Sequence, residues 1–279
     1  MAGVMDQHKK HKSMNDFVRA VQAYFAMHGR HDLPWRKTHD PYHILVSEMM
    51  LQQTQVTRVI PYYENFLREF PTMNVLAQKK LGAVLKMWSG LGYNRRAKFL
   101  HGAAQAVVAH NRGVVPRSYD DLRALPGVGD YTAKAVRIFA YNEREVCIET
   151  NIRTVFIHHF FPQARRVDDA RLMPLIAQAL AQVDSPREWY AALMDYGVYL
   201  KETKGNSARK STVYTKQKAF RGSPREARGR VLRALLKGLA MDEKSLLKAT
   251  TLPKKRLIGA LASLRSEDMI KKVGKKWSA

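Results

Sequence analysis

The feature that most constrains the fold is the five-residue turn LPGVG at positions 125–129, which lies between two apolar-periodic segments. The residues before it predict the end of one short helix, and residues 131–140 predict the start of another. Gly127 and Gly129 supply the left-handed backbone freedom that such a turn needs. The second helix then begins on exposed backbone N–H groups with no side-chain bulk in front of them, an arrangement that binds phosphate.

This pattern is typical of a helix-hairpin-helix, a motif that holds a nucleic-acid backbone without reading its sequence. A GxG turn by itself is a weak signal, and the residues that follow it strengthen the interpretation. Glu149 and Asn151 come shortly after the second predicted helix. A carboxylate close to a turn that holds DNA indicates chemistry at a deoxyribose, beyond binding alone.

The charge of the chain points to the same partner. The 279 residues carry 48 Lys and Arg against 24 Asp and Glu, a formal net charge of +24, and residues 201–279 hold 22 of the basic and 6 of the acidic side chains. Such an excess indicates a polyanion, nucleic acid before an anionic membrane. No apolar run approaches the ~18 residues that span a bilayer, and the N-terminus has no apolar signal core. We therefore expect a cytoplasmic, nucleoid-associated monomer with no membrane contact.

Cysteine usage limits the cofactors. The single cysteine, Cys147, excludes an intrachain disulfide and a cysteine-rich metal cluster. We accordingly predict no metal site built from protein side chains.

Hydrophobic periodicity predicts an all-α fold for the first 200 residues, because no segment shows sustained period-2 alternation. Helices are predicted at 15–28 (with Asn15 as a cap), 43–54, 56–70, 77–88, after Gly90 and Gly92, and at 152–161, 169–183 and 187–200. Residues 1–13 are predicted to be a disordered basic tail, 14–200 a domain of two helical subdomains, and 201–225 a basic linker or DNA-contacting loop.

Residues 226–279 predict a small winged-helix domain. Helices at 226–240, 242–249 and 252–270 would precede a strand and wing. The core of this domain would consist of Val231, Leu232, Leu235, Leu246, Leu247, Leu257, Leu261 and Leu264.

Two surfaces of the predicted helices allow more than one interpretation. Glu48 shares a helix face with apolar residues such as Ile44. It is either a surface residue at the edge of the apolar stripe, the commoner case, or a desolvated acid with a raised pKa. Tyr93, Arg95 and Arg96 follow the two glycines, where they would touch a nucleic acid or form a solvated basic helix start.

Five stretches resemble the MutY family of adenine-specific mismatch DNA glycosylases, in the same order and spacing from about residue 15 to 200. They are LPWR (33–36), SEMMLQQTQV (47–56), WSGLGYNRRAKFLH (88–101), LPGVGDYTAKAV (125–136) and ETNIRTV (149–155). The resemblance implies a helix-hairpin-helix DNA glycosylase fold and double-stranded DNA with a mismatched or damaged base pair as the partner.

The resemblance also implies roles for individual residues. Glu48 falls on the general acid that protonates the purine, and Glu149 on the catalytic carboxylate, normally an aspartate. Tyr131 and Asn151 match residues that support these carboxylates. The predicted DNA-contacting residues are Gln53 and Tyr93, which match side chains wedged into the duplex, the pocket residue Arg36, and Thr54, Arg95, Gly127, Gly129, Thr132 and Arg153.

These roles agree with the chemistry of base excision. A glycosylase must extrude the nucleotide, which requires wedges and a phosphate grip. Cleaving an N-glycosidic bond through an oxocarbenium-like sugar favours one protonated acid at the base and one carboxylate at the sugar. Tyr131 stands where lyase relatives carry a Schiff-base lysine, so a monofunctional enzyme is expected, although Lys134 is nearby.

The chain departs from the family in three respects. Glu149 lengthens the usual aspartate by one methylene. The family carries four cysteines after the equivalent of Gly197 that bind an iron–sulfur cluster, and this chain has none there. A winged helix stands in place of the domain that recognises 8-oxoguanine. No cofactor is therefore expected; similar hairpins bind a monovalent cation on carbonyls such as those of 125–129, but no side chain here indicates one.

Three functions remain open at this stage. The first is a monofunctional glycosylase that excises adenine opposite 8-oxoguanine or G. The second is a glycosylase for another mismatched base, such as thymine in T:G, which the Glu48 match disfavours. The third is a DNA-binding or regulatory protein whose site decayed through the change to Glu149. Retention of Glu48, Tyr131 and Asn151 together argues against such decay.

Overall fold

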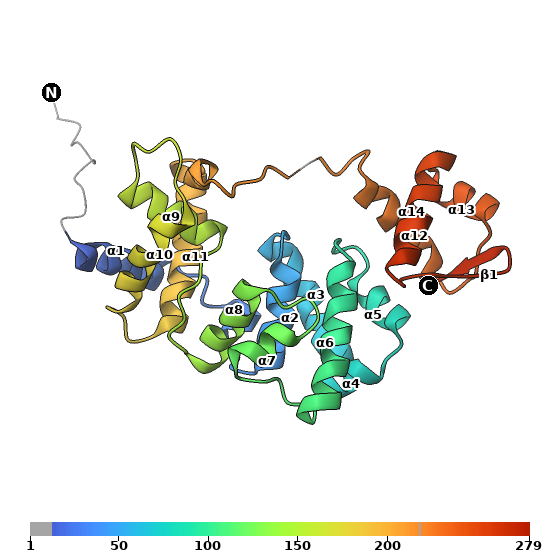
Figure 1. Ribbon diagram of the computed structural model, residues 1–279, viewed down its shortest axis with the longest axis horizontal. Helices are drawn as coiled ribbons and strands as arrows, with labels where there is room; N and C mark the ends of the chain where they lie inside the picture. The colour runs from blue at the N-terminus through green and yellow to red at the C-terminus, as the bar shows by residue number, and fades with distance from the viewer. Residues whose placement is uncertain (1–12, 218) are drawn as a thin grey trace. The chain divides into compact units, whose positions relative to one another are not determined.

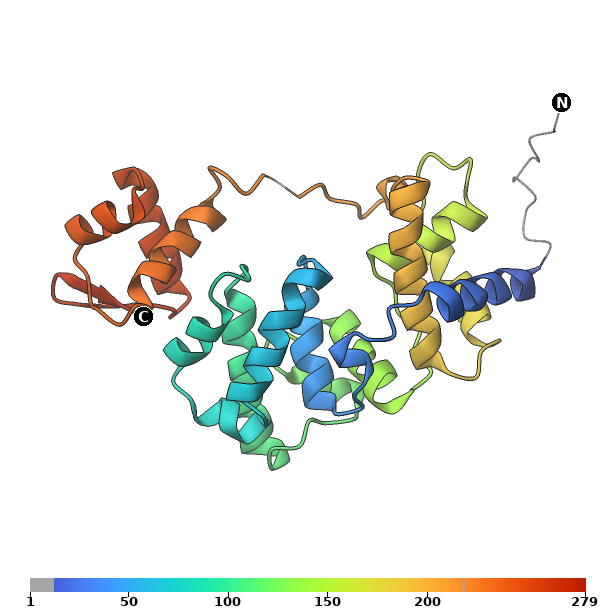
Figure 2. The same ribbon diagram turned by 180° about the vertical axis from the view of Figure 1, so that it is seen from behind.

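The structure is a computed structural model that describes residues 13–217 and 219–279, and it is almost wholly helical (Figures 1 and 2). The predicted basic tail thus lies outside the described residues, apart from Ser13. The described residues form two compact units, one made of residues 13–39 and 130–216 and the other of residues 40–129, 217 and 219–279. No helix in the described part of the chain has both the length and the apolarity that crossing a lipid bilayer requires.

The first unit is built around four helices whose apolar faces meet in one core: α1 (Met14–His28), α9 (Thr150–Phe160), α10 (Asp169–Leu180) and α11 (Pro186–Thr203). Figure 1 shows α10 and α11 beside α9. The core includes Phe17, Phe156 and Trp189, which make edge-on ring contacts. This unit also holds α8 (Asp130–Tyr141) and the 3-10 turns η1 (Pro34–Arg36) and η2 (Ser207–Lys210).

The start of α1 corrects the prediction that Asn15 caps this helix. Ser13 is the cap, because its side chain accepts a hydrogen bond from the backbone N–H of Asp16 at 3.2 Å. Serine and asparagine are similarly effective caps, so the choice depends on where the apolar stripe begins. Here Phe17 and Val18 begin the stripe.

The segment after α11 is more ordered than a linker at 201–225 would be. Residues 201–203 belong to α11, and the chain then folds back on its own unit. Val167 N–H donates to the Lys210 carbonyl at 2.9 Å, and Thr212 N–H donates to the Val167 carbonyl at 3.0 Å. Ala208 is buried beneath this contact. Residues 213–217 and 219–223, which lead to α12, lie in no helix or strand.

The second unit contains α2 (Pro41–Leu51), α3 (Val56–Glu69), α4 (Met73–Gln78), α5 (Leu81–Trp88), α6 (Arg95–Asn111) and α7 (Tyr119–Ala124). Figure 2 shows α2 to α6 from the reverse side. Asp40 caps α2 by accepting from Tyr42 N–H at 2.7 Å, so this helix begins two residues earlier than predicted. The single helix predicted at 77–88 is wrong, since Lys79 and Lys80 are extended and separate α4 from α5.

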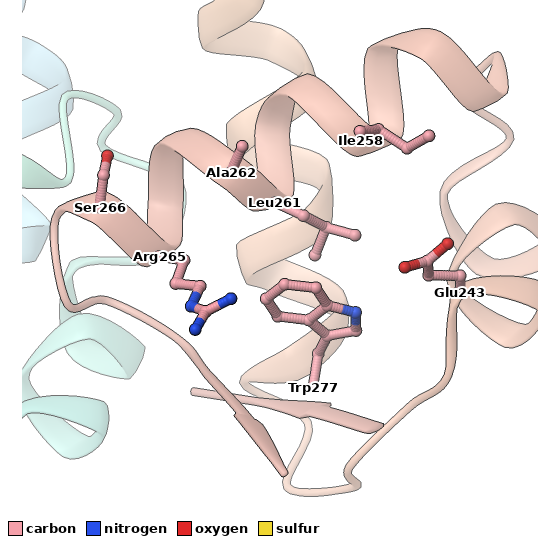
Figure 3. Close-up of a pocket in the computed structure, with 7 residues that line it drawn as sticks. All are labelled: Glu243, Ile258, Leu261, Ala262, Arg265, Ser266 and Trp277. Carbon is pink, nitrogen blue, oxygen red and sulfur yellow. The ribbon is translucent and has the colours of Figure 1, made fainter. Parts of the chain in front are cut away.

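The C-terminal part of the second unit consists of α12 (Pro224–Leu235), α13 (Glu243–Thr250), α14 (Lys254–Ser266) and an antiparallel hairpin of β1 (Lys271–Val273) and β2 (Lys276–Ser278). Met241 forms an isolated antiparallel bridge with Trp277, so a third short segment of chain lies along the hairpin. Trp277 lies beneath α14 with Leu261 above its ring (Figure 3). The predicted core residues are buried except Leu247, which is partly exposed.

Candidate active site

In the first unit, Glu149 is held at the start of α9. Its Oε1 accepts from the backbone N–H groups of Asn151 at 2.6 Å and Ile152 at 2.9 Å, and its Oε2 accepts from Asn151 Nδ2 at 3.3 Å. The extended segment leading to it is anchored by Tyr190, whose hydroxyl accepts from Cys147 N–H at 3.1 Å. The carboxylate therefore has one orientation at the positive end of a helix, and Glu149 as a whole residue is only partly exposed.

Opposing effects set the ionisation of Glu149. Desolvation raises the pKa of its carboxyl group above the ordinary value. The backbone N–H of Ile152, the positive charge of Lys201 and the N–H of Asn151 lower the pKa, but by less than desolvation raises it. A site that combines desolvation with a specific cation is typical of functional carboxylates.

The hairpin before α8 depends on Gly127. This residue has a φ of +75°, and a Cβ atom there would lie 2.5 Å from Cβ of Phe99. Glycine is thus required both for the backbone conformation and for the close packing of Phe99. The left-handed backbone predicted for Gly129 is wrong, since this residue has no positive φ. An added Cβ atom there would lie 3.9 Å from Arg123 Nη1, which donates to the intervening Val128 carbonyl at 2.9 Å.

On α8, the two predicted site residues differ in exposure. Thr132 is buried, whereas Tyr131 is partly buried and packs against the core of the first unit. Lys134, one turn further along, forms an ion pair with Asp130 at 3.0 Å. Lys134, the lysine nearest to the position where lyase relatives are expected to carry their nucleophile, is therefore held in an ion pair.

Two predicted DNA-contacting arginines make ion pairs inside the first unit. Arg36 donates to the two carboxylate oxygens of Asp195 at 2.6 and 2.9 Å. Arg153 binds both oxygens of Asp169 at 2.8 and 2.6 Å. Burial raises the pKa of Asp195, but the hydrogen bonds and charge of Arg36, together with those of Arg30, outweigh burial and hold the pKa below its ordinary value.

In the second unit, Glu48 lies on α2 with 8% of its surface exposed. The surface alternative for this residue is therefore wrong. The helix is buried around its whole circumference from Ile44 to Met50, and these residues are apolar except Ser47 and Glu48. A carboxyl group in such surroundings is desolvated, as the chemistry of a proton donor requires.

Arg96 is buried, so neither a solvated basic helix start nor a surface contact with DNA describes this residue. Its Nη1 donates to the carbonyls of Met49, Met50 and Gln52 at 2.8, 2.7 and 2.7 Å, and its Nη2 donates to Thr54 Oγ1 at 3.1 Å. Burial lowers the pKa of its guanidinium to about 10. The cation caps the negative end of α2 and fixes the turn that follows.

That turn carries Gln53, and the turn before α6 carries Tyr93. Their φ angles are +55° and +50°, a left-handed conformation that is rare for residues other than glycine. Such strain is frequently found at functional sites, where the surrounding structure maintains it. Tyr93 Oη accepts from Gln217 and Arg225, both in the same unit.

Arg95, on the exposed start of α6, is paired with Glu267 at 2.6 Å. Glu267 also binds Arg228, and these partners lower the pKa of the Glu267 carboxyl group to about 2. Arg95 thus links α6 to the residue that ends α14.

No group of three or more His, Cys, Asp or Glu side chains in residues 13–217 and 219–279 is arranged to hold a metal ion. Cys147 is buried in the core of the first unit. The prediction of a protein without a cofactor, and the question of a cation at 125–129, therefore rest on the sequence.

Sequence reasoning missed two contacts of the predicted site residues, one in each unit. Lys201, on α11, donates to Asn151 Oδ1 next to the candidate carboxylate. Arg96 stabilises the turn that carries Gln53. Its hydrogen bond to the Met50 carbonyl joins two residues that are 46 positions apart in the sequence. The only available signal for Lys201 was its spacing of four residues from Gly197, which places both residues on one face of a helix.

The arrangement of a helix-hairpin-helix turn followed by a carboxylate at a helix start defines a class of base excision proteins, and the comparisons agree. A sequence model of the HhH-GPD superfamily base excision DNA repair proteins matches residues 46–180. An adenine DNA glycosylase of Mycolicibacterium smegmatis is 35% identical over 224 residues, which cover 75% of this chain and 76% of that protein. The chain belongs to the HhH-GPD superfamily of base excision DNA repair proteins.

Other relatives match over less of their length. An adenine DNA glycosylase of Buchnera aphidicola subsp. Baizongia pistaciae is 32% identical over 66% of this chain and 52% of its own length, so the chain spans about half of that relative. Among solved structures, a thermostable thymine-DNA glycosylase has a TM-score of 0.60 at 25% identity, covering 71% of this chain and 91% of its own. An endonuclease III–DNA complex, with a TM-score of 0.52 at 16% identity, supports the fold alone.

Proposed function

We propose that this chain is a monofunctional adenine DNA glycosylase that hydrolyses the N-glycosidic bond of adenine in mismatches with 8-oxoguanine or G. The observation that carries the proposal is the desolvated carboxylate Glu149, which is oriented by Asn151 at the start of α9. Glu48, buried on α2, adds a second carboxyl group with the surroundings of a proton donor. The named relatives that are adenine DNA glycosylases support the choice of base.

The two carboxyl groups have different roles in this reaction. Glu48 gives its proton to a ring nitrogen of adenine, which makes the base a better leaving group. As the bond between C1′ and the base breaks, positive charge develops on the sugar, and the anionic Glu149 stabilises it. Water then adds at C1′ and its proton returns through solvent to the Glu48 carboxylate, so the products are free adenine and an abasic site and Glu48 is again an acid.

Duplex DNA is the proposed partner, and the protein binds its backbone without recognising a particular base sequence. The N–H groups that follow Gly129, at the start of α8, hold a phosphate, and Gln53 and Tyr93 enter the duplex to support the extruded nucleotide. Thr54 and Arg95 lie beside these wedges and contact the backbone. The protein acts as a cytoplasmic, nucleoid-associated monomer and needs no cofactor in this proposal.

The C-terminal residues 226–279 are proposed to be a winged-helix domain that adds affinity for DNA, after a glycosylase domain at 14–200 and the connection at 201–225. Three helices followed by a hairpin support this assignment. Lys271, Lys272, Lys275 and Lys276 lie on or beside the two strands, where a wing would meet phosphates. The domain takes no part in base removal.

A single-turnover assay on duplexes with A opposite 8-oxoguanine, A opposite G and T opposite G, each followed by alkali, tests the proposal. The proposal is supported if the parent excises adenine, if Glu149→Gln loses this activity, and if the exposed control Glu202→Gln retains it. Excision of thymine alone would instead favour the second function, for which the likeness to a thymine-DNA glycosylase is the specific observation. Binding without excision of any base would favour a regulatory protein.

A further inference from the structure

Lys201 reaches the side chains around Glu149 because α11 lies unusually close to α9. A Cβ atom at Gly197 would be 2.6 Å from the carbonyl oxygen and 2.7 Å from Cβ of Asn151. Only glycine permits this approach. Lys201 follows Gly197 by one helical turn, so its side chain extends along the same face of α11 to Asn151.

Lys201 determines which way the Asn151 amide points. Its ammonium group is a donor only, and it donates to Asn151 Oδ1. The amide nitrogen must then point the other way, and it donates to Glu149 Oε2 at 3.3 Å. The lysine therefore fixes the asparagine, which in turn fixes the second carboxylate oxygen.

Two cations act electrostatically on Glu149. Arg153, on α9, donates from Nε and Nη2 to the two carboxylate oxygens of Asp169, so its charge is compensated within a bidentate ion pair. Lys201, from α11, is half-buried and donates to an amide oxygen that carries no formal charge. Desolvation lowers the pKa of Lys201 while Glu149 raises it, the reciprocal of the effect of Lys201 on Glu149.

We propose that Lys201 is a positioning residue for base excision, whose ammonium group orients Asn151 and supplies the positive charge that keeps Glu149 an oriented anion. The proposal rests on the proposed role of Glu149 and goes beyond it. It gives the end of α11 a role in the reaction. Neither the motif residues nor the hairpin explains this role. Lys201 itself touches neither the base nor the sugar.

The first test measures single-turnover excision of adenine against pH. Lys201→Gln keeps a hydrogen-bond donor but removes the charge, Lys201→Met removes both, and Lys201→Arg keeps both. The neutral variants should lose about 10²-fold in rate near neutral pH. The acidic limb of their rate–pH profile should move to higher pH, because Glu149 is protonated more readily without the charge of Lys201. Lys201→Arg should keep the position of the limb. Lys204→Gln, at an exposed position just after α11, should behave as the parent.

A merely structural role would lower the rates without moving the acidic limb, and an unmoved limb in both neutral variants would overturn the proposal. Thermal unfolding checks that the variants are folded. The second test does not depend on activity. It follows the ¹³C-labelled carboxyl groups of glutamate in the DNA-free protein through a pH titration, with the Glu149 signal assigned by its loss in Glu149→Gln.

The pKa of Glu149 should be higher in Lys201→Gln than in the parent, and equal values would contradict the proposal. If the parent excises no adenine from any duplex, the proposed function fails, while this titration still decides whether Lys201 controls Glu149.

Discussion

At the scale of single residues, the burial of Glu48 gives the sharpest expectation. Glu48→Gln keeps the shape of the side chain but has no acidic proton, so we expect excision to fall by about 10²–10⁴-fold. Affinity for mismatched DNA, measured by fluorescence anisotropy, should change little. Glu64→Gln, at an exposed position on α3, is the matched control. Rates within a factor of a few of the parent would remove Glu48 from the mechanism.

Glu149 gives a second expectation at this scale. Glu149→Gln should abolish excision, since a neutral amide does not stabilise the sugar cation. Because desolvation raises the pKa of Glu149 and the reaction uses its anion, the parent's rate should fall with acidification at a pH above the ordinary range of glutamate. A rate–pH profile of the chemical step measures this. Full activity in Glu149→Gln would rule out its role.

Glu149→Asp tests how closely the site fits the longer arm. The N-cap hydrogen bonds at 2.6 and 2.9 Å are made with the glutamate arm in place. We therefore expect the shorter aspartate to draw the carboxylate back and to reduce the single-turnover rate. An equal or faster rate would mean that the backbone is placed for aspartate, as the family resemblance implies. Asp195 is a poor substitute for either residue, because Arg36 and Arg30 hold it.

At the scale of elements, Arg96 holds the end of α2 together with the start of α6. Arg96→Met would leave the carbonyls of Met49 and Met50 without this donor, which costs about 1–3 kcal/mol for a buried polar group. Urea unfolding should show a loss of stability of this order, and excision should fall because Gln53 loses its support. Arg95→Met removes an exposed ion pair and should cost less than about 1 kcal/mol. Equal losses in the two variants would contradict the structural role of Arg96.

The elements also show where sequence reasoning succeeds. Apolar stripes identified most helices. Of the two glycines predicted to be left-handed, Gly127 is and Gly129 is not. The break between α4 and α5 was missed because Lys79 and Lys80 carry no turn signature and fit the polar face of a continuous helix.

For the candidate site, motifs identified Glu149 and Asn151 but not the residues that support them. Arg96 and Lys201 were missed because their partners are distant in sequence: Lys201 and Asn151 are 50 residues apart. In a basic chain, a buried arginine within a helix looks the same as one that contacts DNA. Sequence motifs therefore predicted the carboxylate Glu149, whereas the positive charge of Lys201 beside it became evident only from the packing of α11 on α9.

At the scale of the whole molecule, the positive charge is concentrated after residue 200. Removing residues 222–279 should lower affinity for DNA and flatten its dependence on salt, because fewer counterions are released. The opposite-base preference should persist. The measurement is the dissociation constant against the logarithm of salt concentration for both lengths of chain. A changed preference would mean that the C-terminal part reads the mismatch.

The cysteine content gives a further expectation at this scale. We expect purified protein to be colourless and free of iron, since one cysteine cannot provide the four ligands of a cluster. Chelator treatment should leave its unfolding temperature unchanged. Metal analysis by mass spectrometry tests this, and stoichiometric iron would contradict it.

The stretch from 213 to 223, which follows the pairing of Thr212 with Val167, has a kinetic consequence. It joins two parts of the chain that are both proposed to hold DNA, and Val213 and Phe220 within it are exposed. A short connection makes the second contact intramolecular, with an effective concentration on the order of millimolar. A duplex released by one part is then recaptured before it diffuses away. We therefore expect departure of the abasic product, rather than bond cleavage, to limit repeated turnover.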